Sequence, residues 1–452
     1  MTEQTTKKES PVKRLKNNIY FKIGTIIIIV LFLLVPTSMI ESLITEREST
    51  QSLAISEVSS KWAEKQTITG PFISIPYNRY MKESTGKDSV QKTVQIREYL
   101  HILPSQLNIS GTINPEKRYR GIYEVVVYNS KLNISGTFTM VDVKSMDIDP
   151  HNILFDKAEF VVGIDDLRGI EDEVNLLWNN EKISFNPGIT SSDVVNTGIN
   201  ALLNIVPSDS TVYNFTLSLD LKGSQLLYFT PVGKVTDIAL TSEWSNPSFN
   251  GAFLPDSREV NEKGFVAKWN VLHLNRNFPQ SWTNNRHRIY NSSFGIDLLL
   301  PVDNYQKSYR SVRYAILFIG LTFLIFFFIE VLHKVFIHPI QYILVGVALI
   351  VFYTLLLSIS EHLHYNFAFI ISAIATLLLI AGYVRAILRS GSFTMLISGI
   401  LTVLYTFIFV IIQLQDYALL IGSVGLFIIV GLVMYFSRKI DWYSLNLNDK
   451  KE

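Results

Sequence analysis

Apolar residues are distributed very unevenly along this chain. One apolar run lies near the N-terminus, a long stretch without such runs follows, and further runs then succeed one another almost without interruption up to Phe436. A helix needs about 20 apolar residues to cross the hydrocarbon core of a bilayer. We therefore predict six transmembrane helices, one before and five after the intervening region, at 23–40, 314–332, 342–359, 367–384, 393–412 and 417–436.

Charges beside the apolar runs predict the orientation of the chain. Residues 1–22 are basic. The short connections expected on the same side carry the cationic residues Lys334, Arg385, Arg389, Arg438 and Lys439. The two short connections on the opposite side contain Glu361 and Asp416 but neither Lys nor Arg. Under the positive-inside rule, both termini, including the tail 437–452, are cytoplasmic, and the region 41–309 is translocated to the periplasm. No small-residue cleavage site follows the first run, so we expect an uncleaved anchor instead of a signal peptide.

The region between the first and second apolar runs has two patterns. Residues 41–67 mix apolar and charged residues without Pro or Gly, which predicts a helix that continues from the first span and ends at Thr69-Gly70-Pro71. Beyond it, apolar and polar residues alternate in short runs separated by Gly, Pro and Asn, as in a mostly antiparallel sandwich or two stacked sheets. The length allows two subdomains, with a boundary near 186–196. The predicted fold class is a membrane α-helical bundle, at 310–436, plus a large β-rich extracytoplasmic domain, α+β overall.

One short segment is repeated. Residues 107–112, Leu-Asn-Ile-Ser-Gly-Thr, recur unchanged at 132–137, and a Tyr- and Val-rich run lies between the copies. The repeat indicates either a duplicated unit or two equivalent strands that flank a third. We favour the flanking strands, because two copies are too few for a repeat architecture.

Composition excludes several classes of function. The chain is 48% hydrophobic and 17% charged, against about 25% charged in soluble proteins, as expected for a membrane protein. A formal net charge of +1 argues against a nucleic-acid partner, and the absence of cysteine excludes disulfides and thiolate chemistry. No His-Glu-x-x-His, glycine-rich phosphate loop or nucleophile elbow is present. We therefore expect no catalytic residue, cofactor, nucleotide or metal ligand.

Polar residues at the predicted outer face form a candidate cluster. Its members are Glu361, His362, His364, Gln413 and Asp416. Three interpretations stay open: a proton or metal site, a polar seat for the soluble domain, or ordinary interfacial residues. The other Glu and His at helical spacing, Glu330 and His333, lack a second such pair, so we interpret them as an interfacial helix end.

An aromatic segment in the β region is a second candidate. Trp244, Phe249, Phe253 and Leu254 lie close together in sequence among turn residues. They could form a surface that binds a glycan, a lipid or another partner, or they could pack in the core and corners of a large β domain.

Several motifs resemble a known family. They are Gly70-Pro71, Ile75-Pro76-Tyr77, Arg120-Gly121-Ile122-Tyr123, Asp166-x-Arg168-Gly169-Ile170, Trp244-x-x-Pro247-Ser248-Phe249-x-Gly251, Leu254-Pro255, Val302-Asp303-x-Tyr305-Gln306-Lys307, His338-Pro339-x-Gln341-Tyr342, Ser360-Glu361-His362 and Asp416-Tyr417-Ala418-Leu419-Leu420. In this order they resemble the CreD family of bacterial inner-membrane proteins, over about 40–442. The resemblance implies a periplasmic domain after one span, then a helical bundle, and a role in envelope integrity and envelope-stress responses. It implies no established reaction, ligand or catalytic residue.

The leading functional hypothesis is a non-enzymatic protein of the bacterial inner membrane whose β domain binds an envelope protein or a lipid, with membrane lipids around the bundle. One alternative is a transporter of a lipid or hydrophobic substrate that uses a lateral groove in the bundle. Another is a membrane-embedded enzyme that acts at the periplasmic face through Glu361, His362 and Asp416. The span centres contain no ionisable residue, which disfavours ion-coupled transport.

Overall fold

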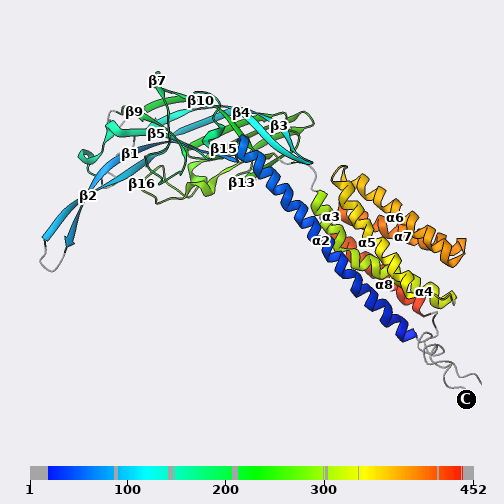
Figure 1. Ribbon diagram of the computed structural model, residues 1–452. Helices are drawn as coiled ribbons and strands as arrows, with labels where there is room; N and C mark the ends of the chain where they lie inside the picture. Colours follow the sequence, from blue (N-terminus) through cyan, green and yellow to red (C-terminus); the bar gives the residue numbers. More distant parts are fainter. Residues whose placement is uncertain are drawn as a thin grey trace, which may run out of the picture. The chain divides into compact units, whose positions relative to one another are not determined.

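The computed structural model comprises two compact units, each described here by itself (Figure 1). We call Met1–Gln51 with Val302–Glu452 the helical unit and Ser52–Pro301 the β unit. The structure describes residues 19–85, 90–140, 146, 148–205, 212–298, 300, 304–333, 335–414, 417–438 and 440.

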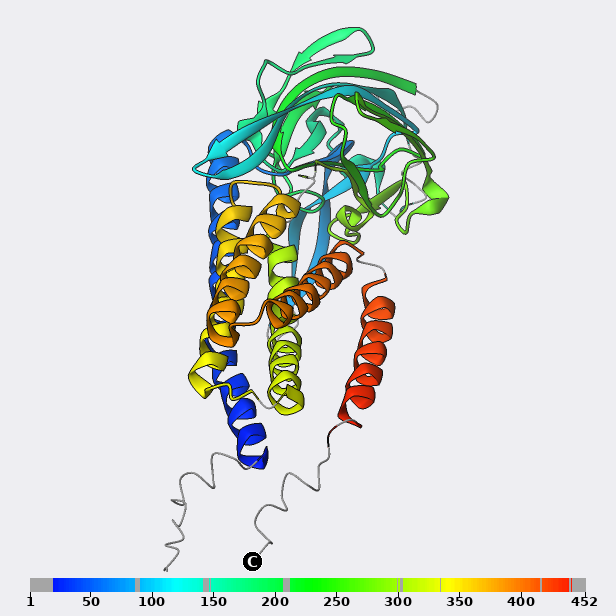
Figure 2. The same cartoon turned by 90° about the vertical axis from the view of Figure 1, so that its right-hand side faces the viewer.

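The helical unit confirms the predicted spans. Its helices are α2 (Ile19–Trp62), α3 (Asn304–Arg313), α4 (Ala315–His333), α5 (Pro339–Ser360), α6 (Tyr365–Leu388), α7 (Gly391–Gln413) and α8 (Ala418–Ser437). All but α3 are long and apolar enough to cross a membrane, which makes six candidate spans among the described residues. The short helix α3, which the sequence patterns did not predict, precedes α4 directly. Figure 2 shows α8, in red, at the edge of the helical unit.

Helix α2 belongs to both units, because it runs without a break from the first span into the β unit. It ends at Trp62, and the next strand begins at Gln66. The prediction that the helix ends at Thr69-Gly70-Pro71 was therefore wrong. These residues lie inside the strand, at an irregularity in its pairing between Thr69 and Phe72.

The β unit consists of two mostly antiparallel sheets, as predicted. The first has the order β13-β17-β11-β1-β5-β9-β8, with β2 and β16 attached beside β1. Its strands are β1 (Gln66–Thr85), β2 (Val90–Ile102), β5 (Ala158–Ile164), β8 (Asn186–Pro187), β9 (Gly198–Leu203), β11 (Leu226–Thr230), β13 (Pro247–Gly251), β16 (Ser281–Thr283) and β17 (Phe294–Leu298). The second has the order β14-β15-β12-β3-β4-β10-β6-β7. Its strands are β3 (Gln106–Arg120), β4 (Tyr123–Thr139), β6 (Asn175–Trp178), β7 (Glu181–Ser184), β10 (Val212–Ser224), β12 (Val235–Ser242), β14 (Ser257–Asn261) and β15 (Gly264–Leu272).

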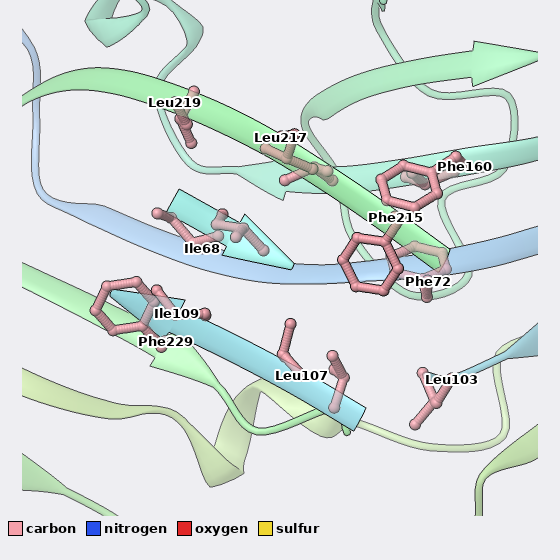
Figure 3. Packing of buried hydrophobic residues seen from close by; sticks show 14 of the residues in the cluster. Ile68, Phe72, Leu103, Leu107, Ile109, Phe160, Phe215, Leu217, Leu219 and Phe229 are labelled. Atoms are coloured by element: carbon pink, nitrogen blue, oxygen red, sulfur yellow. The ribbon is translucent and has the colours of Figure 1, made fainter. Parts of the chain in front are cut away.

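One continuous hydrophobic core joins the two sheets (Figure 3). The ring of Phe160, from the first sheet, lies 5.9 Å from that of Phe138 and 5.4 Å from that of Phe215, both from the second. Such aromatic pairs add to the stabilisation that burial itself provides. The suggested subdomain boundary at 186–196 has no counterpart in this packing, because β8 pairs with β9 inside the same sheet.

The two copies of the repeat lie on adjacent strands, so the interpretation that they flank a third strand was wrong. In the antiparallel pair of β3 and β4, Asn108 lies opposite Ser135 and Ile109 opposite Ile134. The Tyr- and Val-rich run is the first half of β4. A Cβ on Gly136 would lie 2.0 Å from the carbonyl oxygen of Gln106, so glycine here permits the close approach of the strands.

The first hairpin of the β unit extends beyond the rest of its sheet (Figure 1). We call residues 78–85 of β1 and 90–97 of β2 the arm. Within the described residues, these parts of the two strands pair only with each other, since β5 pairs with β1 no further than Ser74 and β16 meets β2 only from Leu100 onward.

Candidate functional site

The membrane-spanning part of α2 carries a cation near each end, and each cation pairs with a carboxylate of the helical unit. At one end, Lys22 Nζ lies 2.8 Å from Glu330 Oε1. The other carboxylate oxygen accepts a hydrogen bond of 2.9 Å from the Tyr342 hydroxyl, and the Ile337 amide donates to Oε1 at 3.3 Å. Glu330 is 4% exposed. Burial of a charge is costly unless it is paired and hydrogen-bonded, and all of these contacts provide that compensation.

This burial corrects the interpretation of Glu330 as part of an interfacial helix end. His333, on the same helix, lies elsewhere, with its ring centroid 4.7 Å from that of Phe393. The two residues therefore share no site. A sequence signal for the ion pair is hard to find, because 308 positions separate Lys22 from Glu330.

At the other end of the span, Arg47 Nε lies 3.6 Å from Glu361 Oε1. The Tyr305 hydroxyl, from α3, donates a hydrogen bond of 3.2 Å to the same oxygen. Asn304 Nδ2 donates to the Ser360 carbonyl oxygen at 2.7 Å. Glu361 thus connects α2 and α3 to the end of α5, an arrangement that packs helices together.

The remaining members of the predicted outer cluster do not gather around Glu361. His362 and His364 are exposed, and Gln413 donates a hydrogen bond from Nε2 to Asn366 Oδ1. Asp416 lies outside the described residues. Among the residues that are described, no group of three or more His, Asp or Glu side chains could hold a metal ion. The role of this cluster remains a prediction.

The helical unit also contains an apolar groove of about 490 Å³ between α4, α7 and α8. Its walls are the side chains of Leu321, Leu324, Ile325, Phe328, Ile400, Val403, Leu404, Phe407, Gly425, Ile428, Ile429, Leu432, Val433 and Phe436. None of these residues is polar or charged. The sequence patterns did not place this groove, because it depends on how three separate helices pack.

The aromatic segment of the β unit contributes mainly to packing. Phe249 is 9% exposed, with its ring 5.7 Å from that of Phe265, and Phe253 packs edge-on against Phe294. Trp244 is partly buried against the core, and its indole nitrogen donates to the Asn246 carbonyl oxygen. Leu254, at 66%, is the largely exposed member.

The Asp166-x-Arg168 motif lies beside the end of α2 in the β unit. Asp166 accepts hydrogen bonds from the Glu64 and Arg168 amides, and Arg168 pairs with it while donating to the Ser60 carbonyl oxygen. These hydrogen bonds hold the pKa of Asp166 below its usual value, with the Arg168 guanidinium as the largest cause and burial opposing it. Trp62 is covered by two cations, Arg118 and Lys222, each 4.9 Å from its ring centroid. The motif is therefore a fastening of α2 to the β unit.

Comparison with known proteins gives the family. An M1 zinc metallopeptidase from Deinococcus radiodurans of known structure matches over 38% of this chain and 38% of its own, with 8% identity and a TM-score of 0.19, too slight a likeness to bear on fold or function. The inner membrane protein CreD of Escherichia coli (strain K12) is 31% identical over 441 residues, 97% of this chain and 96% of its own. The model of the family described as inner membrane protein CreD matches residues 18–443. This chain therefore belongs to the CreD family of inner membrane proteins.

Proposed function

We propose that this protein is a non-enzymatic component of the inner membrane that supports envelope integrity under stress, and that its β unit lies in the periplasm and binds an envelope protein through the arm. The charges beside the predicted spans support this orientation. The observation that carries the proposal is the arm itself.

The arm has two properties of a strand-binding surface. Its outer edges are open among the described residues, so each strand presents unpaired backbone N–H and C=O groups. A two-stranded ribbon alone is also only marginally stable in water. Addition of an extended segment from a partner to such an edge satisfies the backbone groups and widens the sheet.

Side chains on the arm add an apolar face. Arg79 lies opposite Ile96 and Met81 opposite Val94, so Met81, Val94 and Ile96 share one face of the ribbon. Met81 is 46% exposed and Ile96 39%. Tyr80, on the opposite face, is 54% exposed. A partner strand with apolar residues at alternate positions would cover the first face.

Photocrosslinking in living cells tests this proposal. A photoreactive amino acid at Tyr80 of the full chain should capture an envelope protein. The double variant Met81→Ser, Ile96→Ser should lose the captured product and reduce survival under a detergent challenge to the envelope.

Leu177→Ser with Leu202→Ser is the matched control, because these exposed leucines lie on other strands of the β unit, at 48% and 56% exposure. The control should retain both capture and survival. Normal survival after replacement of the arm by a short turn, with the protein still present in the membrane, would contradict the proposal.

A further inference from the structure

We propose that the groove between α4, α7 and α8 binds one acyl chain of a phospholipid and that Arg438 binds the phosphate at the end of this groove. The inference goes beyond the proposed function, which concerns the β unit, and the two can fail separately. It rests on the shape of the groove, its lining and the position of one cation.

The shape arises from one close contact between α7 and α8. Gly425, on α8, faces the ring of Phe407, and a Cβ at this glycine would lie 2.1 Å from that ring. The two helices thus approach closely at this point, as small residues allow in membrane proteins. Among its described residues α8 has none that is buried, so the rest of the helix stands away from α4 and leaves the groove open.

The lining selects an apolar chain. All the wall residues belong to helices that are long and apolar enough to cross a membrane, and no wall residue has a polar side chain. Along α8 the wall extends from Gly425 to Phe436, which is about 16 Å at the helical rise per residue. A polar substrate would find no hydrogen-bond partner along this length, whereas an acyl chain needs none.

A cation lies where the groove ends. Arg438 follows the wall residue Phe436 by two positions, and its guanidinium carbon is 4.3 Å from the ring centroid of Tyr435. Arg438 is exposed, and no carboxylate is among the wall residues. A guanidinium presents several N–H donors that match the oxygens of a phosphate, and an aromatic ring beneath it is typical of the membrane interface. This charge favours a phospholipid over a neutral lipid, and over the helix of a second copy.

Photolabelling of the purified full-length protein in lipid vesicles tests the site. The probe is a phosphatidylglycerol with a diazirine in one acyl chain, in vesicles of unlabelled phosphatidylglycerol. Labelled residues should map to the facing sides of α4, α7 and α8. Ile428→Trp places an indole in the groove and should reduce labelling there about fivefold, whereas Phe427→Trp, on the neighbouring exposed position, should leave it unchanged.

Two further measurements decide the remaining outcomes. Val403→Trp narrows the groove from α7 and should reproduce the loss if Ile428→Trp fails to fold. Arg438→Gln should lower labelling by the phospholipid probe but not by a diazirine fatty alcohol, which has no phosphate. Equal labelling of all helices that no variant changes would overturn the proposal, since it indicates bulk lipid only. A dimer that Val403→Trp dissociates would also overturn it, because a second copy would then occupy the groove.

Discussion

Lys22 Nζ lies 2.8 Å from Glu330 Oε1, although 308 positions separate the two residues in the sequence. A second pair, Arg47 with Glu361, lies 25 residues further along α2, about 37 Å at the helical rise per residue. This separation is comparable with the thickness of a bilayer including its interfaces. The two pairs therefore bracket the apolar part of α2 and hold it against the later helices.

Lys22→Met is expected to destabilise the helical unit. The substitution leaves the Glu330 carboxylate, 4% exposed, without its cation, and loss of one partner from a buried pair costs about 3 kcal/mol. Thermal unfolding of the full-length protein in detergent should show a lower Tm.

The double variant Lys22→Met, Glu330→Gln should recover part of that loss, because it removes the uncompensated charge. Lys61→Met, at an exposed pair with Glu57, should have almost no effect. A Tm for Lys22→Met equal to that of the unsubstituted protein would show that the pair does not stabilise the helical unit.

The spans were predictable because each depends on local composition: a run of apolar residues has the same meaning wherever it occurs. The end of α2 was not, because Gln66 joins a strand by pairing in parallel with Leu227, far along the chain. Nothing near Gln66 in the sequence reports this pairing.

The candidate site shows the same division. Glu361 was found because its position between two spans is a local property, whereas its partners Arg47 and Tyr305 come from other helices. Phe249 gave an ambiguous signal, since an aromatic residue among turn residues suits either a surface or a core. Its burial follows from packing against Phe265 and Trp269 on β15, which only the fold brings near.

Asp166→Asn is expected to change how stability depends on pH. The pKa of Asp166 is held below its ordinary value, so the carboxylate contributes stability that is present above about pH 4 and is lost as the pH falls through the lower pKa of the folded protein. The variant should therefore be less stable at pH 7, by about 1–3 kcal/mol from the loss of charged hydrogen bonds.

Chemical unfolding of the full-length protein at pH 7 and at pH 3 measures this effect. The difference between the unsubstituted protein and Asp166→Asn should narrow at the lower pH. Asp172→Asn, at an exposed neighbouring carboxylate, serves as the control and should shift neither value. An unchanged difference at the two pH values would show that the charge of Asp166 is not what stabilises the end of α2.

Phe249→Ala and Leu254→Ala separate packing from binding in the aromatic segment. Phe249 is almost fully buried, and truncation of a buried Phe to Ala costs about 3–5 kcal/mol. Leu254 is 66% exposed, so its truncation should leave the Tm unchanged. If Leu254→Ala nevertheless abolishes a crosslink from this segment, Leu254 is a binding residue; equal Tm values for both variants would contradict the packing described here.

Gly136→Ala tests why the repeat contains glycine. The added methyl group would lie 2.0 Å from the Gln106 carbonyl oxygen, so β3 and β4 would have to move apart at a cost of about 2–3 kcal/mol. Asn133→Ala, at an exposed position of the same repeat, should cost far less. Unfolding midpoints in denaturant measure both. Similar midpoints for the two variants would show that the strands do not need the glycine.

The most direct test of the central claim, that the β unit is periplasmic and the chain crosses the membrane as its charges predict, is thiol labelling in spheroplasts. The chain has no cysteine, so each introduced thiol is unique. Leu274→Cys, in the β unit, and His362→Cys, between α5 and α6, should react with a membrane-impermeant maleimide, whereas Ser392→Cys, at the start of α7, should react only after the membrane is opened. Labelling of Ser392→Cys in intact spheroplasts, with Leu274→Cys protected, would contradict the proposed orientation and with it the periplasmic role of the arm.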